Sequence, residues 1–248
     1  MTKLLKLNVI VILVMILSYN AQSIGLGFYV PFSSGTSTNE ISDGGPNWNA
    51  SHSGAGFGFV MDTKLAGDKL FNYRLNIGFH YSSSLADNPD YIAILPDSYY
   101  NYGYDVSNYS LVFDNTFGFG FLRTPALRLW AGPQLRFGYT FGTGDANCKY
   151  CNYTDKLEIT DYQVGLGFAP VLGANFNLGN VVSLCADMGY RWTIGYGGCN
   201  YDYYDNSFAS NNDAGVFSEV SEYFVNISLI FRINDNFKSY GSRTKKRR

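Results

Sequence analysis

The sequence predicts an all-β fold: an eight-stranded antiparallel up-and-down transmembrane β-barrel, preceded by a signal peptide. Three observations predict it. Apolar and polar residues alternate in eight long segments, short and long connections between the segments alternate, and the face opposite the apolar residues is rich in glycine. A period of two places each set of residues on its own face of a strand. In a membrane barrel the apolar face points to lipid and the polar face points inward.

The composition supports this fold and excludes one class of function. Only 15% of the 248 residues are charged, against about 25% in an average soluble domain, whereas 17% are aromatic and 27 are glycine. Outside residues 1–23 and 238–248, the chain carries ten basic and twenty acidic residues. A nucleic-acid-binding body would be basic, so no nucleic-acid partner is expected.

The first 23 residues have the features of a secretory signal peptide. Lys3 and Lys6 are followed by the apolar run 9–17, which is too short to cross a bilayer comfortably. The small residues of 21–23 make Ile24 a plausible mature N-terminus. An uncleaved anchor is the alternative interpretation. The protein is therefore expected to be exported to the envelope. If the mature chain crosses a membrane, it is expected to do so with β-strands.

Eight alternating segments are expected to form strands, each long enough for a tilted strand to cross hydrocarbon. In order they are Ile24–Phe32, Ser53–Thr63, Phe71–Ser82, Asn108–Leu122, Leu127–Phe141, Asp161–Leu178, Val181–Tyr196 and Ser221–Ile233. Their apolar faces are represented, in the same order, by Phe28, Phe59, Phe79, Phe113, Phe137, Leu166, Trp192 and Leu229. The opposite faces are represented by Gly27, Gly58, Arg74, Asp114, Arg136, Gly165, Asp187 and Asn226.

The connections alternate strictly between short and long. The short ones are Thr63–Leu70, Arg123–Ala126 and Gly179–Asn180. The long, polar ones are Ser33–His52, Ser83–Ser107, Gly142–Thr160 and Gly197–Val220. Turns at one rim and long loops at the other are typical of outer-membrane barrels, in which both termini are periplasmic. A soluble secreted barrel is the alternative, but glycine in a solvent-facing strand destabilises it, whereas a narrow barrel interior requires small side chains.

Between Ile24 and Ile233 the chain resembles the small eight-stranded outer-membrane barrels, of the OmpA-like transmembrane domain and opacity-protein type. The resemblance is carried by Gly132–Gly142, Pro170–Trp192 and Tyr223–Phe231. It implies an integral protein in the outer membrane of a Gram-negative-type envelope, in contact with outer-membrane lipid and monomeric. In that family the last strand ends on a phenylalanine, which Phe231 matches, although this chain continues to Arg248.

Charged residues on the inward faces predict an ion-pair network in the lumen. A buried charge requires a partner, and Asp114, Arg136, Asp187 and Arg191 are expected at neighbouring levels near the middle of the barrel. The network either plugs the lumen or gates a narrow porin-like pore, and eight strands favour the plug because they leave no continuous channel. The predicted network comprises Arg74, Asp114, Arg128, Arg136, Asp187, Arg191 and Arg232.

His80 and Ser82 raise an enzymatic alternative. Outer-membrane lipid A deacylases have eight strands and a His-x-Ser pair of this type, so a lipid A-modifying enzyme is a second alternative. The alternation points both residues inward, whereas acyl-chain chemistry takes place at the lipid face. No third residue that would orient the histidine is identifiable. We therefore expect no enzyme, no catalytic residue and no cofactor, and we expect His52 to be solvated in the first long loop.

The four cysteines belong to an exported chain, in which disulfides are permitted. Cys148 and Cys151 lie in the third long connection and Cys199 in the fourth. Cys199 pairs with one of the other two, or Cys148 pairs with Cys151. Cys185 is expected to point inward near the short-turn rim, too far from Cys199 to bridge it. A zinc site at Cys148 and Cys151 lacks two further good ligands, so no metal is expected.

Tyrosines in the long connections form a candidate contact surface for an extracellular protein or lipopolysaccharide, because tyrosine provides contact area at low entropic cost. They are Tyr99, Tyr100, Tyr102, Tyr201, Tyr203 and Tyr204. A loop cap packed over the barrel mouth is the alternative. Residues 234–248 form a basic tail, expected to be periplasmic. The sequence thus favours a structural or adhesion-type surface protein that presents four long extracellular loops.

Overall fold

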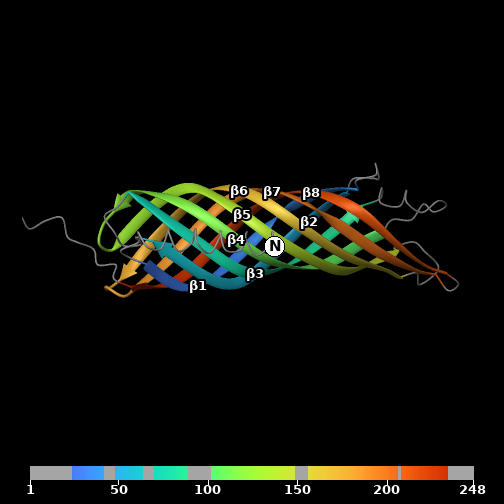
Figure 1. The fold of residues 1–248 in the computed structure, drawn as a ribbon, viewed down its shortest axis with the longest axis horizontal. Helices are drawn as coiled ribbons and strands as arrows, with labels where there is room; N and C mark the ends of the chain where they lie inside the picture. The colour runs from blue at the N-terminus through green and yellow to red at the C-terminus, as the bar shows by residue number, and fades with distance from the viewer. Residues whose placement is uncertain are drawn as a thin grey trace, which may run out of the picture.

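The computed structural model describes residues 24–41, 48–63, 70–88, 102–148, 156–205 and 208–233. Within them, eight antiparallel strands close into one barrel in chain order (Figure 1). The strands are β1 (Ile24–Ile41), β2 (Trp48–Thr63), β3 (Phe71–Asn88), β4 (Tyr102–Arg123), β5 (Leu127–Cys148), β6 (Lys156–Leu178), β7 (Val182–Asp205) and β8 (Phe208–Ile233). The predicted fold class is confirmed. No helix among the described residues is long and apolar enough to cross a membrane.

The barrel closes where β1 pairs with β8, with a stagger that sets the strand tilt. When each residue is followed to its partner on the next strand, the path that starts at Leu26 on β1 returns to β1 at Thr36. The barrel therefore closes with a stagger of ten residues along the strand. The intermediate partners are Met61, Leu75, Asn115, Leu135, Phe168, Trp192 and Ser221. For eight strands this stagger corresponds to a tilt of about 40° and an interior just wide enough for side chains.

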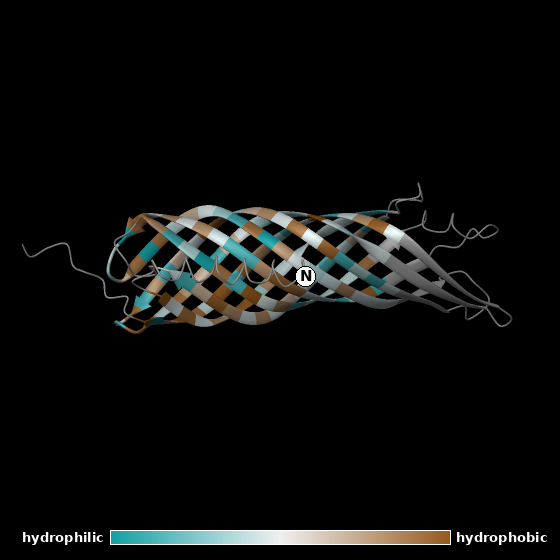
Figure 2. Cartoon of the chain, in the orientation of Figure 1, coloured by the Kyte–Doolittle hydropathy of each residue, from teal (hydrophilic) through white to brown (hydrophobic). Residues whose placement is uncertain are grey.

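The two faces of the sheet are arranged as the alternation predicts. Phe79, Phe137 and Leu229 point outward with 58%, 46% and 42% of their surface exposed, whereas Arg191 is buried in the lumen. Brown apolar and teal polar residues alternate along each strand in Figure 2. A broad exposed apolar surface around a buried charged interior is the inverse of a soluble domain, and it is the arrangement that lipid requires.

The strands are much longer than predicted, and the expected long loops were wrong in extent. The connection expected at Ser33–His52 is mostly strand, since β1 continues to Ile41 and β2 begins at Trp48. The connection expected at Gly197–Val220 is likewise mostly strand, and β8 alone has 26 residues. Antiparallel pairing satisfies backbone N–H and C=O groups in water as well as in lipid, so the ladders continue past the apolar belt.

Several predicted features lie outside the described residues. These are the signal peptide (1–23), the basic tail (234–248), and Tyr99, Tyr100 and Cys151. The backbones of Tyr102 and Cys148 lie in β4 and β5, and the backbones of Cys199, Tyr201, Tyr203 and Tyr204 lie in β7 rather than in loops. Their side chains are outside the described set. Ile24 and Ile233 are paired, so β1 begins and β8 ends at the rim that carries the short connections.

Candidate functional site in the barrel lumen

A lower ion cluster fills the lumen on the short-turn side. The Arg74 guanidinium, from β3, donates from Nε to Asp62 Oδ2 and from Nη1 to Asp187 Oδ2, both at 2.7 Å. Its Nη2 donates to Asn175 Oδ1 at 3.1 Å. Asn226 Nδ2 donates to the second oxygen of Asp187 at 2.7 Å. One arginine thereby joins strands β2, β3, β6 and β7 across the interior, with charge-assisted bonds of the strong kind.

An upper ion cluster lies toward the long-strand mouth. Arg136 donates two hydrogen bonds to the Asp114 carboxylate, at 2.6 and 2.8 Å. Arg191 donates to Glu222 Oε1 at 2.5 Å and to Gln134 Oε1 at 2.8 Å. Nη1 of Arg136 lies 3.4 Å from the same Glu222 oxygen. Glu222 and Gln134, which were absent from the predicted set, therefore complete this network.

His52 also contacts Glu222, and the expectation that it is solvated in a loop was wrong. It lies on β2, its side chain is 9% exposed, and its Nε2 is 3.4 Å from Glu222 Oε2. The error follows from the strand extension, because the continued alternation turns His52 inward. Glu222 is thus shared by two arginines and one histidine at the top of the upper ion cluster.

Two of the predicted arginines lie at the short-turn rim. Arg128 Nη2 donates to Asn72 Oδ1 at 3.1 Å and to the carbonyl of Leu70 at 3.3 Å. Arg232 Nη2 donates to the carbonyl of Gly179. These bonds tie the ends of strands to the neighbouring short connections. Arg128 and Arg232 therefore close the rim beneath the lower ion cluster.

Large aromatic side chains share the lumen with the charges, which the sequence analysis did not anticipate. Trp130 is fully buried, its ring centroid is 5.0 Å from Arg74 Cζ, and its indole donates to Asn175 Oδ1 at 3.1 Å. The Phe224 ring centroid is 4.0 Å from Arg191 Cζ. An arginine over an aromatic face is attracted to the ring in addition to its ion pairs.

Glycines make room for these inward aromatic side chains. A Cβ at Gly173 would overlap the Trp130 indole, and a Cβ at Gly78 would overlap the Tyr29 phenol. In the sequence, glycines on strands next to bulky inward residues could have indicated these buried rings. The alternation predicts only that this face is small, whereas part of it accommodates specific rings.

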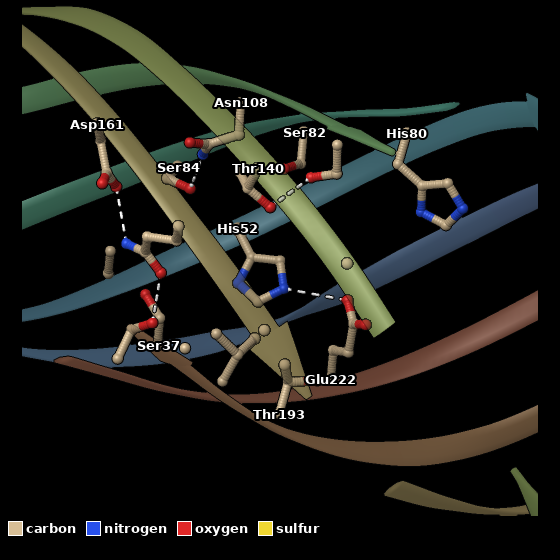
Figure 3. Close-up of a pocket in the computed structure, with 18 of the residues that line it drawn as sticks. Ser37, His52, His80, Ser82, Ser84, Asn108, Thr140, Asp161, Thr193 and Glu222 are labelled. Atoms are coloured by element: carbon tan, nitrogen blue, oxygen red, sulfur yellow. Dashed lines mark hydrogen bonds and ion pairs between the residues drawn. The ribbon is translucent and has the colours of Figure 1, made fainter. Parts of the chain in front are cut away.

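A cavity of about 180 Å³, lined by both polar and apolar side chains, opens above the upper ion cluster, and we call it the vestibule (Figure 3). Its floor includes Arg136 and Glu222, and its walls carry many hydroxyl groups. His80 and Ser82 both line it, so the structure places this pair in the lumen rather than at the lipid face. The hydroxyl-bearing wall residues on the inward faces are Ser33, Ser37, Ser82, Ser84, Ser110, Thr140, Thr193 and Ser218.

Among the side chains that the structure describes, no group of three or more histidine, cysteine, aspartate or glutamate side chains has an arrangement that could hold a metal ion. Cys185 is a buried free thiol, packed near Tyr29, Val60 and Ile230. The described lumen therefore contains a charged plug on the short-turn side and a hydroxyl-rich cavity toward the long-strand mouth.

Comparison with known proteins supports the fold. No family model and no curated protein matches the sequence. Among solved structures, OprG, an outer membrane protein of Pseudomonas aeruginosa, is similar over 85% of this chain and 95% of its own, with a TM-score of 0.55 and 12% identity. A major outer membrane protein of Thermus thermophilus is similar over 84% of this chain and 99% of its own, at a TM-score of 0.43 and 17% identity.

A third similar structure is Ail, the attachment invasion locus protein of Yersinia pestis, at a TM-score of 0.31 and 11% identity over 84% of this chain and 98% of its own. Together with the closed ring of eight antiparallel strands, the likeness to OprG shows the class of fold. The chain has the fold of the small eight-stranded outer-membrane β-barrel proteins.

Proposed function

We propose that this protein is an integral outer-membrane barrel that acts at the cell surface through its outer end, with a lumen that does not conduct. The main observation behind this proposal is that side chains plug the lumen. Among the described side chains, Arg74 with its two carboxylates and Arg136 with Asp114 cross the lumen at successive levels, and Trp130 fills space beside the lower cluster. An interior of this width has no room for a bypass once such side chains fill it.

The exposed apolar belt supports insertion in lipid. Tyrosines follow this belt toward the long-strand end on four neighbouring strands, at Tyr81, Tyr109, Tyr139 and Tyr162. Such a band of tyrosines is typical of a membrane–water interface. On this basis the short-turn rim, with both chain ends of the barrel, is periplasmic. Closure of the barrel leaves no free strand edge, which is consistent with a monomer.

The outer extension supports a role at the surface. A tilted strand needs about 9–11 residues to cross the bilayer, whereas the strands have 16 to 26 residues. The excess residues lie at the end opposite the short turns and would project the sheet outward. This projection would present the outer end of the barrel to an extracellular protein or lipopolysaccharide. It therefore suits an adhesion-type or structural role.

Planar-bilayer recordings of the refolded protein test the closed lumen. We expect no stepwise conductance from the native protein. A variant with Arg74→Ser and Trp130→Ala removes the two largest obstructions and serves as the open control. Insertion of the native protein is checked separately on the same vesicle preparation by the heat-modifiable gel migration of the folded barrel, so that an absence of conductance is not a failure to insert. Stable single-channel steps from the native protein would refute the proposal and favour the narrow porin-like channel.

A binding screen tests the surface role. The refolded barrel is presented to matrix proteins and to lipopolysaccharide, with two matched deletions. Replacing residues 89–101 by a short turn alters the outer end, and shortening residues 64–69 alters the opposite rim. Binding that is lost with the first deletion and kept with the second supports the proposal, whereas equal loss contradicts it.

A lipid A assay tests the expectation that the protein is not an enzyme. Expression of the native protein, or of His80→Ala and Ser82→Ala variants, is expected to leave the acyl content of lipid A unchanged. Loss of acyl chains that depends on either residue would establish the enzymatic alternative.

A further inference from the structure

The proposed role at the cell surface does not by itself involve the vestibule. It is a recess of about 180 Å³, well above the minimum volume that a single water needs. Its lower end is closed by the upper ion cluster. A solute that enters from the long-strand mouth meets a blind recess, which suits binding better than passage.

The charges of the floor are already engaged. Arg136 gives Nε and Nη2 to Asp114 and Nη1 to Glu222. Glu222 in turn is contacted by Arg191 and by His52. An anion would have to compete with carboxylates for these guanidinium groups. The floor therefore does not select for a charged ligand.

Two buried polar atoms in the vestibule lining have no hydrogen-bond partner in the structure: Nε2 of His80 and Oδ1 of Asp161. The other oxygen of Asp161 accepts a hydrogen bond from Gln163 at 2.8 Å, and Gln163 Oε1 accepts one from Ser218 at 2.5 Å. Buried polar atoms without partners are destabilising, so ligand or solvent groups are expected to meet them. A carboxylate oxygen and an imidazole nitrogen both bind hydroxyl groups.

The walls repeat hydroxyl and amide groups along the barrel axis. On β3, His80 is followed on the same face by Ser82 and Ser84, which extends this wall over about 13 Å at strand rise. Asn108 donates to Ser84 at 2.8 Å, and Ser110 and Thr140 lie within 2.8 Å. Hydroxyls both donate and accept, so these walls suit a ligand that presents hydroxyl groups at several levels.

We propose that the vestibule binds the end of a short neutral oligosaccharide that enters from the outer mouth. Sugar hydroxyls would donate to Asp161 Oδ1, meet His80 Nε2, and exchange hydrogen bonds with the serine and threonine walls. The length of the walls selects a chain of sugar units over a single sugar. This inference deepens the proposed surface role, and it rests on that role only in requiring the vestibule to open outside the cell.

Calorimetric titration of the refolded protein with maltotriose tests the proposal. The detergent is lauryldimethylamine oxide, because sugar-headed detergents would compete for the site. Glucose, choline and inorganic phosphate are titrated in parallel. We expect saturable binding of maltotriose, at least tenfold weaker binding of glucose, and no binding of choline or phosphate.

Variants locate the binding. Asp161→Asn keeps the shape of the side chain and removes its charge, and it is expected to weaken maltotriose binding about tenfold, since charge-assisted hydrogen bonds are the stronger ones. Gly138→Val is expected to abolish binding. A Cβ there meets Val112 at 3.6 Å, an ordinary contact, so the variant adds bulk to the vestibule without a clash at Cβ. Glu219→Gln, on the exposed face of β8, is the matched control and should bind like the native protein.

Native folding of each variant is checked by its heat-modifiable migration on a gel. Absence of saturable maltotriose binding by the native protein would overturn the proposal. So would undiminished binding by both Asp161→Asn and Gly138→Val, or preferential binding of choline or phosphate. A protein that binds maltotriose but no matrix protein or lipopolysaccharide would retain the vestibule site and lose the adhesion role, so the two failures are distinguishable.

Discussion

Replacing Arg74 with methionine should reveal how strongly the lower ion cluster stabilises the barrel. Methionine keeps an unbranched side chain at this position but lacks the guanidinium. In the described structure this is the only guanidinium that contacts both Asp62 and Asp187. The substitution also leaves Asn175 Oδ1 without the donor from Nη2. Two buried carboxylates would then face each other across the lumen without their shared cation.

Removing one member of a buried ion pair costs about 3–5 kcal/mol, because the remaining charge is uncompensated. Arg74 serves two carboxylates, so we expect the upper part of this range, about 5 kcal/mol of unfolding free energy. Urea unfolding of the protein in lipid vesicles, followed by tryptophan fluorescence, measures it. The exposed substitution Glu219→Gln is the control and should stay within about 0.5 kcal/mol of the native value.

A triple variant separates charge compensation from packing. Asp62→Asn, Arg74→Met and Asp187→Asn together remove all three charges and keep the side-chain volumes close to native. Replacing a whole buried ionic group is often nearly neutral, so this variant should recover most of the stability lost in Arg74→Met. The reasoning is refuted if Arg74→Met costs less than about 1 kcal/mol, or if the triple variant is no more stable than the single one.

The same unfolding assay checks three further predictions. Phe79→Lys places a charge on the lipid face and should cost about 2–4 kcal/mol; a neutral result would contradict the assignment of that face to lipid. Trp130→Ala should cost about 3–5 kcal/mol through the cavity it leaves, and a loss below 1 kcal/mol would show that the indole is not packed. Gly173→Val should cost about 1–3 kcal/mol or more by overlapping the same indole, and this loss should shrink when Trp130 is alanine.

The orientation of each strand was predictable because lipid and lumen impose opposite chemistry on alternate residues. Phe79 and Arg74, five residues apart on β3, were assigned to opposite faces from the pattern alone, and the structure has them so. The end of each strand was not predictable in the same way. Beyond the apolar belt both faces of the sheet are polar, so hydropathy no longer distinguishes a strand such as the outer half of β8 from a loop.

The contacts inside the lumen depend on the stagger, which no local pattern encodes. Arg74 is 113 residues from Asp187 in sequence, and their meeting requires the tilt that the ten-residue displacement imposes. The predicted network therefore contained all five lumen arginines, but it did not include Glu222, an inward charge by the alternation, as the shared partner of Arg136 and Arg191. His52 was missed for the related reason that its strand was assumed to have ended.

The change from plug to vestibule follows from side-chain size at constant barrel width. Strand number and stagger fix the interior radius along the whole barrel, so the free volume at each level depends on which side chains point inward. Below, Arg74 and Trp130 are long enough to meet near the axis. Above, β3 presents Ser82 and Ser84 where it presented Arg74, and β6 presents Gly165, so the same cylinder is open. A barrel meant only as an inert anchor would gain stability by filling both levels. The retention of an open, hydroxyl-lined upper level above a stable plug is therefore the feature of this chain that most needs a functional explanation, and ligand binding at the outer mouth supplies one.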